Sequence, residues 1–519
     1  MRALLPQPAT VQWRAEGYTL TSTTTLGPAS AAAAPAAAVV WRLLSRTTGL
    51  PLAPRQAPDV VVQLTDELAE EAYHLAVGPE GVQIVAGGQR GALWAAQTLL
   101  QLGPAEIYAA PRGVDVPLDG ANISDAPRFA RRGAMLDSAR HFVPLADVLD
   151  FVDWLARHKL NVFHWHLTDD QGWRVALDKY PRLATHASWR ARTTNRAGGD
   201  DHTPHGGYYT LDQIQQVADY ARALGIEIVP ELDFPGHATA VLHAYPEFAT
   251  DPHAVTEVAH YPQIFPNVLN LSPAALDFVH DAWQAVIDAT GATYVHIGGD
   301  EVPTTHWEAS PEVKQRAAAW GVADVRKLQR WFTEHLRDWL RQRGVIPIGW
   351  DEIIDDGPVP GMVCQAWRGA DAGRRAAQHG MDVIMSPLSH TYLDFYQSPL
   401  RSEPYAQGVV LPIEEVYAFD PTAELDPPAA ARVLGTQFQL WAEFQPTYRK
   451  LQYQAWPRGC ALAEVAWSAP AGRSWQAFAP RLEAHLQRLA AAGLNYRPLA
   501  GPHPWQEGGT GWFQRPAAD

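Results

Sequence analysis

The sequence predicts an α/β protein in which a (β/α)8 TIM barrel follows a small α+β domain. Two observations predict the barrel. From about residue 130 onward, short apolar segments alternate with amphipathic stretches, which is the pattern of parallel strands separated by helices. Polar and aromatic residues follow each expected strand, and barrel enzymes place their functional groups at these strand ends. We therefore expect two domains in this chain of 519 residues, 1–125 and 126–519.

The small domain is predicted from three strands and one helix. Residues 60–64, VVVQL, indicate a strand, and residues 72–77 and 81–85 indicate a hairpin because a Pro-Glu-Gly turn separates them. Residues 91–102 indicate an amphipathic helix. The segment 111–128 is rich in proline, aspartate and glycine, and we expect it to link the two domains.

The barrel is predicted from eight short apolar segments with helical stretches between most of them. The expected strands are residues 133–136, 161–166, 227–232, 294–297, 346–349, 362–365, 382–385 and 433–438. The expected helices are residues 145–155, 211–224, 273–289, 325–343 and 475–492. Segments 167–210 and 233–275 are long for loops, which indicates that they extend over the catalytic face and have a functional role there.

The composition argues against several classes of partner. The net charge is −15 and there is no basic block, so neither nucleic acid nor an anionic membrane surface is expected. Cys364 and Cys460 show no disulfide or zinc pattern, and we expect no metal and no cofactor. No secretory signal is visible, and the alanine-rich run 29–40 is shorter than the ~20 residues of a membrane span. A cytoplasmic location is therefore expected.

Two adjacent carboxylates, Asp300 and Glu301, are the most informative residues of the chain. They follow the apolar run 294–297, and Gly298 and Gly299 remove side-chain bulk at the end of this expected strand. Glycosidic bonds are cleaved with carboxyl groups, because one acid protonates the departing oxygen while a second group supports positive charge at the sugar carbon. An adjacent pair by itself is weak evidence, since the chain contains other pairs and most such pairs are solvated.

Functional side chains follow all eight expected strands, which indicates one shared site. These residues are Asp137, Arg140, His141, His164, His166, Asp169, Asp170, Trp173, Glu231, Asp233, His237, Asp300, Glu301, Trp350, Asp351, Glu352, Trp367, His390, Tyr392, Asp394, Trp441 and Glu443. The 20 tryptophans and 17 tyrosines of the chain fit sugar binding, because flat rings stack on the apolar face of a pyranose.

The pair His164 and His166 allows a second interpretation. The two residues alternate within an expected strand and face the same side, so we interpret them as buried, hydrogen-bonded histidines. The alternative is a metal hydrolase whose site Asp169, His237 and Asp300 would complete. The tryptophan-rich surroundings and the lack of a second histidine pair fit zinc poorly.

Seven sequence blocks occur in order along the expected barrel. They are RRGAMLDSARHF (131–142), KLNVFHWHLTDDQGWR (159–174), PELDFPGHATA (230–240), HIGGDEV (296–302), GWDE (349–352), TYLD (391–394) and LWAEF (440–444). Together these blocks resemble glycoside hydrolase family 20, the β-N-acetylhexosaminidases. Residues 71–99 also resemble the small domain that precedes the barrel in this family, so the resemblance covers nearly the whole chain.

The resemblance implies a substrate-assisted mechanism with retention of configuration, in which the 2-acetamido oxygen of the substrate attacks the anomeric carbon. It implies that Glu301 is the general acid and then the base, and that Asp300 orients the acetamide. It further implies that Tyr392 hydrogen-bonds the acetamide oxygen, and that Asp169 and His237 form a relay behind Glu301.

The resemblance also implies a set of substrate-binding residues. They are Arg140, Trp350, Trp367, Asp394, Trp441 and Glu443. The three tryptophans would wall the pocket for the N-acetyl group and stack on the sugar ring. Arg140 would bind the 3- and 4-hydroxyls as a rigid donor fork, and the two acids would bind O4 or O6.

We therefore expect an exo-acting β-N-acetylhexosaminidase that releases terminal β-linked GlcNAc, and also GalNAc, from small glycans. A lacto-N-biosidase or a transglycosylating variant of the same scaffold is one alternative. A non-catalytic glycan-binding protein is another, although the presence of both Asp300 and Glu301 disfavours it. The protein is expected to be a monomer or a homodimer.

Overall fold

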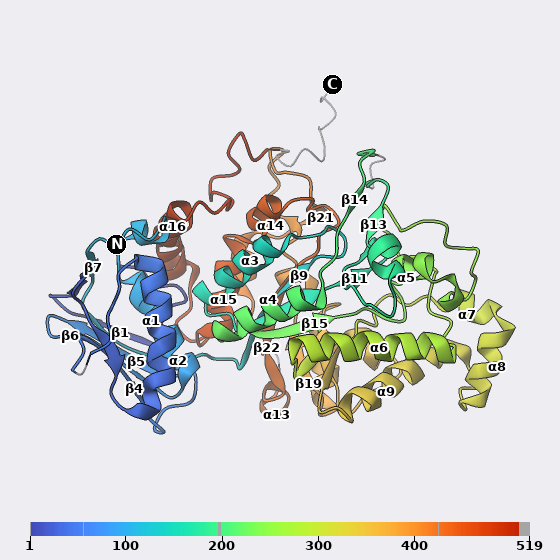
Figure 1. Ribbon diagram of the computed structural model, residues 1–519, viewed down its shortest axis with the longest axis horizontal. Helices are drawn as coiled ribbons and strands as arrows, with labels where there is room; N and C mark the ends of the chain where they lie inside the picture. The colour runs from blue at the N-terminus through green and yellow to red at the C-terminus, as the bar shows by residue number, and fades with distance from the viewer. Residues whose placement is uncertain (1, 56, 196–198, 424, 508–519) are drawn as a thin grey trace.

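Eight parallel strands close into a barrel (Figure 1). The computed structural model describes residues 2–55, 57–195, 199–423 and 425–507. The barrel strands are β9 (Arg131–Asp137), β10 (Val162–His166), β15 (Glu227–Glu231), β16 (Tyr294–His296), β17 (Ile346–Trp350), β18 (Val363–Ala366), β19 (Asp382–Met385) and β22 (Val433–Leu440). Each strand pairs with the next one in the chain, and β22 pairs with β9. All eight strands overlap the predicted segments, so the predicted barrel is confirmed.

The interior of the barrel consists of an apolar layer below a polar layer. Val162, Val229, Ile348, Val363 and Ile384 form a separate buried cluster from five strands. Side chains two positions apart in a strand face the same side. The next inward positions toward the carboxyl ends are therefore His164, Glu231, Trp350, Gln365 and Ser386, all of them buried. The functional side chains are placed at this end of the barrel.

Helices surround the barrel and connect its strands (Figure 1). The longer ones are α3 (Leu145–Arg157), α4 (Leu211–Ala223), α6 (Pro273–Thr290), α8 (Pro311–Ala319), α9 (Leu328–Arg341), α10 (Ala370–Gln378), α14 (Tyr448–Ala455), α15 (Arg458–Trp467) and α16 (Trp475–Ala491). Short ones are α5 (Thr239–Ala244), α7 (Thr305–Ala309), α11 (Leu388–Thr391), α12 (Ile413–Ala418) and α13 (Pro427–Ala430). Among the described residues, no helix has both the length and the apolarity needed to cross a bilayer.

Local sequence explains where the helices begin and end. Helix α6 begins after Ser272, whose hydroxyl accepts a hydrogen bond from the Ala275 amide, and it ends at Gly291, whose φ is +61°. Helix α4 begins with a capping box between Thr210 and Gln213. The stretch expected as one helix over 325–343 is divided, because a single 3-10 turn precedes α9.

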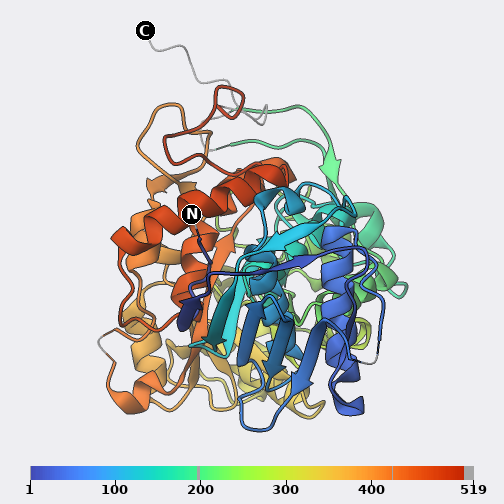
Figure 2. The ribbon, with the colours of Figure 1, turned by 90° about the vertical axis from the view of Figure 1, so that its left-hand side faces the viewer.

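The small domain contains a six-stranded sheet with two helices (Figures 1 and 2). In sheet order its strands are β1 (Thr10–Trp13), β8 (Ala121–Asp125), β5 (Tyr73–Gly78), β6 (Gly81–Ala86), β4 (Val60–Leu64) and β3 (Leu26–Pro28). A separate pair is formed by β2 (Tyr18–Leu20) and β7 (Val116–Leu118). The helices α1 (Ala34–Thr48) and α2 (Gln89–Gln101) pack against each other and join the apolar cluster of this sheet.

The predicted link over residues 111–128 was wrong. This segment supplies β7 and β8, and β8 lies between β1 and β5 in the sheet. The alternation of buried Ala121, Ile123 and Asp125 is typical of a strand, but the surrounding proline, aspartate and glycine masked it in the sequence. Helix α1 was not predicted either, and it contains part of the alanine-rich run 29–40.

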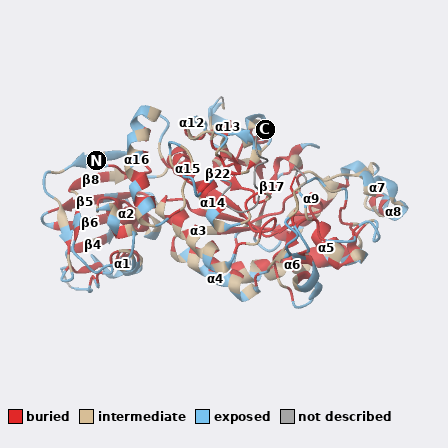
Figure 3. Ribbon diagram, turned by 90° about the horizontal axis from the view of Figure 1, so that it is seen from above, coloured by how far each residue is buried: buried red, intermediate tan, exposed pale blue. Residues whose placement is uncertain are grey.

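A buried polar cluster joins the small domain to the barrel. Lys159, which follows α3, donates to the Tyr73 hydroxyl over 2.8 Å and to the Asp125 carboxylate over 2.9 Å. Trp467, at the end of α15, donates to the same carboxylate over 3.0 Å and packs into the apolar cluster of the small domain. Figure 3 shows buried residues on both sides of this junction. The two domains therefore share one desolvated contact region.

Lys159→Met is expected to destabilise the protein by about 3–5 kcal/mol, because it leaves the buried Asp125 carboxylate without its cation. The matched control is Lys179→Met, which removes an exposed lysine paired with Asp281 and should change stability by less than about 1 kcal/mol. Urea unfolding followed by tryptophan fluorescence measures both free energies. Equal losses in the two variants would show that the Lys159 contact does not join the domains.

Candidate active site

A cavity of about 290 Å³ opens where the barrel strands end. Its lining includes Arg140, Gln171, His237, Ile264, Asp300, Glu301, Trp367, Tyr392, Asp394, Gln407, Trp441 and Glu443. Nine of the eleven residues that were assigned catalytic or substrate-binding roles therefore surround one space. Asp169 and Trp350 are the two of these eleven that do not line it; both are almost fully buried and contact residues that do.

The adjacent acids lie on a sharply turned loop directly after β16. Gly298, Gly299 and Glu301 have φ values of +66°, +92° and +49°. Such angles suit glycine but strain a residue with a side chain, and strained residues occur mostly at functional sites. The turn leaves the side chain of Asp300 13% exposed and that of Glu301 34% exposed.

Gly298 is needed because the backbone passes very close to Asp233. A Cβ atom at this position would lie 1.7 Å from Oδ1 of Asp233. The same oxygen accepts a hydrogen bond of 3.0 Å from the Gly299 amide. Asp233 therefore fixes the turn that presents the acid pair.

Burial and the nearby Asp300 carboxyl raise the pKa of Glu301, although the charge of His237 opposes this rise. His237 approaches both acids, with 3.7 Å from Nε2 to Oδ2 of Asp300 and 3.7 Å from Nε2 to Oε2 of Glu301. A carboxyl with a raised pKa keeps its proton to higher pH. Glu301 is therefore suited to donate a proton.

Behind the acids, His237 is held by two carboxylates. Its Nδ1 lies 3.2 Å from Asp169 and 3.1 Å from Asp170. Burial alone would lower the pKa of His237, but Asp169 and Asp300 raise it well above its ordinary value. Asp169 and His237 are thus hydrogen-bonded in the order of the predicted relay, and Nε2 of His237 lies 3.7 Å from Glu301.

Arg140 is fixed from three sides. Its guanidinium contacts Asp137 at 3.2 Å and Asp169 at 2.8 Å, and its Nε donates to Gln171 over 3.2 Å. It also lies over the ring of Trp441, with its Cζ 4.7 Å from the ring centroid. A guanidinium held in this way is a pre-oriented hydrogen-bond donor for a ligand.

Two of the three predicted tryptophans are held by hydrogen bonds from their indole groups. Trp350 donates to Glu231 over 3.0 Å, and Trp367 donates to Glu352 over 3.0 Å. The rings of Trp350 and Trp441 lie 5.7 Å apart. The hydrogen bond therefore restrains Trp367 on the cavity wall, and Trp350 is held next to Trp441, which lines the cavity.

Several buried oxygens at the site have no partner within the described part of the chain. Oδ1 of Asp300 and Oδ1 of Asp394 are two of them. A buried polar group without a partner is costly, so these atoms need a hydrogen-bonding ligand. Burial and the neighbouring Glu443 carboxyl raise the pKa of Asp394 well above its usual range, which allows a proton to be shared there.

His164 and His166 are buried and hydrogen-bonded, as predicted. His164 contacts Glu231 at 2.9 Å and Gln437 at 2.8 Å, and His166 contacts Glu231 and, at 2.9 Å, Asp169. Both ring nitrogens of each histidine are therefore occupied by side chains.

Sequence reasoning missed the lining residues Pro262, Gln263, Ile264 and Gln407, and also Gln171, Leu388 and Phe395. The first three lie in segment 233–275, whose unusual length was the only signal for them. Gln407 belongs to β21 (Gln407–Val410), which pairs with β20 (Phe395–Tyr396) on this face. Short strand pairs also stiffen the other excursions on this face: β11 (Thr168–Asp169) with β12 (Gly172–Trp173), and β13 (Trp189–Arg190) with β14 (His205–Gly206).

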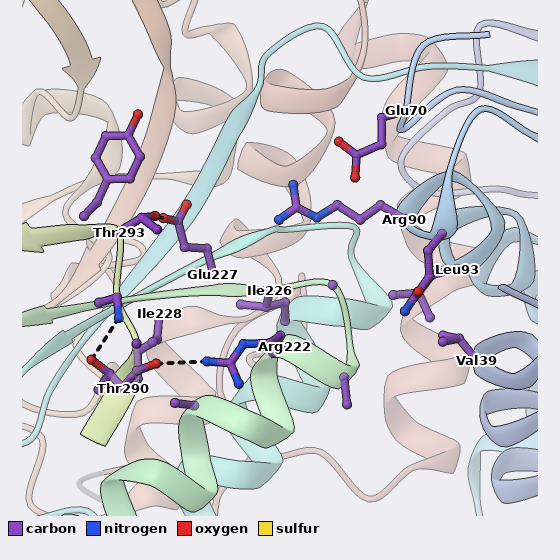
Figure 4. A pocket seen from close by; sticks show the side chains of 17 residues that line it. Val39, Glu70, Arg90, Leu93, Arg222, Ile226, Glu227, Ile228, Thr290 and Thr293 are labelled. Atoms are coloured by element: carbon purple, nitrogen blue, oxygen red, sulfur yellow. Dashed lines mark hydrogen bonds between the residues drawn. The ribbon is translucent and has the colours of Figure 1, made fainter. Parts of the chain in front are cut away.

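A separate cavity of about 480 Å³ lies at the junction of the small domain and the opposite end of the barrel (Figure 4). Two of its charged side chains are engaged within the protein: Arg222 donates to the Thr290 carbonyl and Glu227 accepts from Thr293. None of the predicted site residues lines it. We therefore interpret this cavity as a gap in the packing between the two domains.

The fold and the site define a glycoside hydrolase of the barrel type, because an acid pair, a relay and aromatic walls meet at the strand ends. Residues 129–470 match the model of the glycosyl hydrolase family 20 catalytic domain, and residues 1–126 match the model of domain 2 of the same family. The chain therefore belongs to glycosyl hydrolase family 20. The resemblance predicted from the sequence blocks is confirmed.

Curated relatives and solved structures agree with this assignment. The chain is 38% identical over 454 residues to a β-hexosaminidase of Porphyromonas gingivalis, with 86% of this chain but only 56% of the relative covered. It is 32% identical over 501 residues to a β-N-acetylhexosaminidase of Cellulomonas fimi, with 93% of each covered. The chain thus spans just over half the length of the first relative and most of the second.

Among solved structures, an exo β-N-acetylglucosaminidase of Vibrio harveyi in complex with N-acetylglucosamine superposes with a TM-score of 0.85 at 32% identity. The superposition covers 96% of this chain and 78% of the other. A Streptomyces plicatus N-acetyl-β-hexosaminidase gives 0.82 at 30% identity, with coverage of 96% and 97%. Both domains of the chain are therefore shared with these enzymes.

Gly298→Ala is expected to destabilise the protein more than Gly321→Ala. Both glycines have positive φ, +66° and +79°, so each alanine costs about 1–2 kcal/mol of backbone strain. Only at Gly298 does the new Cβ meet Asp233, which adds about 1–3 kcal/mol, whereas Gly321 has no atom within 4 Å. Urea unfolding measures the difference, and equal costs would show that the close approach is not real.

Proposed function

We propose that the chain is an exo-acting, retaining β-N-acetylhexosaminidase that releases terminal β-linked GlcNAc, and also GalNAc, from the non-reducing ends of small glycans. One observation carries the proposal. Asp300 and Glu301 are neighbours on one turn and face one cavity, together with Tyr392. Adjacent acids suit a reaction in which no enzyme carboxylate attacks the opposite face of the sugar.

In the proposed reaction, Asp300 holds the acetamide N–H and Tyr392 donates to the acetamide oxygen. This oxygen attacks the anomeric carbon while Glu301 gives its proton to the departing oxygen, which yields an oxazolinium intermediate. Glu301 then takes a proton from water, and the water opens the intermediate with retention. Glycosyl hydrolase family 20 is one of the families that use this substrate-assisted scheme instead of two opposed carboxylates.

The cavity supports a single N-acetylated sugar as the bound unit. Its volume of about 290 Å³ is at the lower limit of ligand sites, near ~300 Å³. Arg140 would donate to the 3- and 4-hydroxyls, and Asp394 and Glu443 would bind O4 or O6. In this arrangement both acids lie near O4. The equatorial 4-hydroxyl of GlcNAc and the axial 4-hydroxyl of GalNAc could then each find an acceptor, so the proposal includes both sugars.

A second cavity of about 520 Å³ lies next to the sugar cavity and offers space for the departing group. It shares Glu301 and Ile264 with the sugar cavity, so the proposed proton donor lies between the two spaces. Its other lining residues include Arg326, Glu352 and Arg368. We assign the departing group to this polar space, which suits a second sugar better than an apolar aglycone.

The 4-nitrophenyl β-glycosides of GlcNAc, GalNAc and glucose test the proposal. We expect turnover of both N-acetyl sugars but not of the glucoside, because only the acetamide supplies a nucleophile. Glu301→Gln and Asp300→Asn should each lower kcat by about 100-fold or more, since the first removes the base that activates the water and the second removes the acetamide partner.

The matched control is Glu415→Gln, which changes one acid of the exposed adjacent pair at the start of α12 and should leave the rates unchanged. Turnover of the glucoside at an equal rate would overturn the substrate-assisted mechanism. Turnover of none of the three would leave a narrower glycan specificity or a binding function.

The pH dependence is expected to follow the protonated fraction of Glu301. Its raised pKa keeps the proton in place at low pH, and kcat/KM should fall as the pH rises through that pKa. Nitrophenolate departs with little protonation, so the alkaline fall should be weaker for the nitrophenyl glycoside than for a β-linked GlcNAc disaccharide. Identical alkaline profiles for the two substrates would argue against Glu301 as the acid.

A further inference from the structure

The carboxylate of Glu231 lies in the barrel interior and has no part in the function proposed above. It is the last residue of β15, it is fully buried, and it lines neither of the two cavities that meet at Glu301. Four side chains surround it at hydrogen-bonding distance, and these are His164, His166, His296 and Trp350. A buried carboxylate is costly unless it is well paired, so this arrangement calls for an explanation.

One of these contacts starts a chain of hydrogen bonds that reaches His237, whose Nε2 lies 3.7 Å from each of the two acids. Oε2 of Glu231 contacts Nδ1 of His166, and Nε2 of His166 lies 2.9 Å from Oδ2 of Asp169. The other oxygen of Asp169 lies 3.2 Å from Nδ1 of His237. Nε2 of His237 is 3.7 Å from Glu301. The path thus runs from the centre of the barrel to the proposed proton donor.

The position of His166 between two carboxylates determines its protonation. A carboxylate only accepts hydrogen bonds, so each ring nitrogen of His166 must carry a proton, and the ring is an imidazolium. Burial opposes this charge, but Glu231 and Asp169 raise the pKa of His166 well above its ordinary value. Charges therefore alternate along the path.

His164 provides the contrast on the same strand. It also contacts Glu231, but its second nitrogen faces the amide of Gln437, which can donate to it. One proton on the ring satisfies both contacts, and burial lowers the pKa of His164 to about 4. His164 is therefore neutral and lies off the path, although it touches the same carboxylate as His166.

We propose that Glu231 is a positioning residue for the acid pair, which keeps His166 doubly protonated so that Asp169 stays ionised and holds His237 in place against Glu301. The proposal rests on the function proposed above for Glu301. It extends the path by two residues beyond the relay of Asp169 and His237. It also predicts that the effect of Glu231 on the reaction passes through Asp169.

A double-mutant cycle tests the route. Glu231→Gln keeps the shape of the side chain and an acceptor for Trp350 but removes the charge that His166 needs. We expect kcat for the 4-nitrophenyl GlcNAc glycoside to fall about tenfold with KM little changed, the loss expected for one charge-assisted hydrogen bond. In an Asp169→Asn background, Glu231→Gln should lower kcat by less than about twofold, because the path is already broken.

His164→Asn supplies the matched background, since it removes a histidine that contacts the same oxygen of Glu231 as His166 does but lies off the path. There the tenfold effect of Glu231→Gln should persist. A tenfold loss that persists in the Asp169→Asn background, or that vanishes in the His164→Asn background, would overturn the proposal. Either result would show that Glu231 acts through its neighbours in the barrel core and not through the relay.

A second measurement does not depend on activity. In the full-length protein labelled with ¹⁵N-histidine, the His166 ring, assigned by comparison with His166→Gln, should carry protons on both nitrogens at about pH 8, where free histidine with a pKa of about 6.5 is neutral. The second proton should be lost in Glu231→Gln. A neutral His166 ring in the wild-type protein would overturn the proposal even if the enzyme is fully active.

The two measurements separate this inference from the proposed function. An inactive wild-type protein with a doubly protonated His166 would contradict the hexosaminidase proposal and leave the ionisation of the path standing. An active enzyme with a neutral His166, or with additive effects in the cycle, would contradict only the role assigned to Glu231.

Discussion

The arrangement of the site depends on the contacts that the ionised carboxylate of Asp169 makes. Three cationic groups converge on it: Arg140 at 2.8 Å, His166 at 2.9 Å and His237 at 3.2 Å. Burial alone would raise its pKa, but Arg140 and His237 hold the pKa of Asp169 below its usual range. One carboxylate therefore holds two residues that line the cavity, Arg140 and His237. In the proposed reaction, it would position the group that binds the sugar hydroxyls and the group next to the acid pair together.

Five carboxyl groups of the site fall into two kinds according to their partners. Asp169 and Glu231 do not line the cavity, are surrounded by arginine or histidines, and have lowered pKa values. Glu301, Asp394 and Glu443 line the cavity and have raised pKa values, for which burial is the main cause. A carboxylate that only positions other side chains is stabilised by close pairing with cations. A carboxyl group that must exchange a proton or bind a sugar hydroxyl works better when no cation occupies its oxygens.

The barrel and most of the lining residues could be predicted because their signals are local. Apolar runs mark the strands, and a polar residue after a run lies at the strand end. The arrangement around Glu231 could not be predicted, because it depends on register: His166 pairs with Glu231 on one side, and His296 pairs with it on the other. The register between neighbouring strands of the closed barrel sets these pairings, and the sequence of a single strand does not reveal that register. The strand β8 was missed for a similar reason, since β1 and β5 complete its pattern.

Two of the seven described non-glycine residues with positive φ lie where His237 approaches the acids. His237 and Glu301 both have positive φ, +46° and +49°, although neither is glycine. Such conformations persist only when the surroundings fix them. Here Asp233 fixes the turn before Glu301 through the Gly299 amide, and Asp169 and Asp170 fix His237 through its Nδ1. The strain therefore has a specific effect: it brings the relay histidine and the proton donor, which come from different strands, to within 3.7 Å of each other.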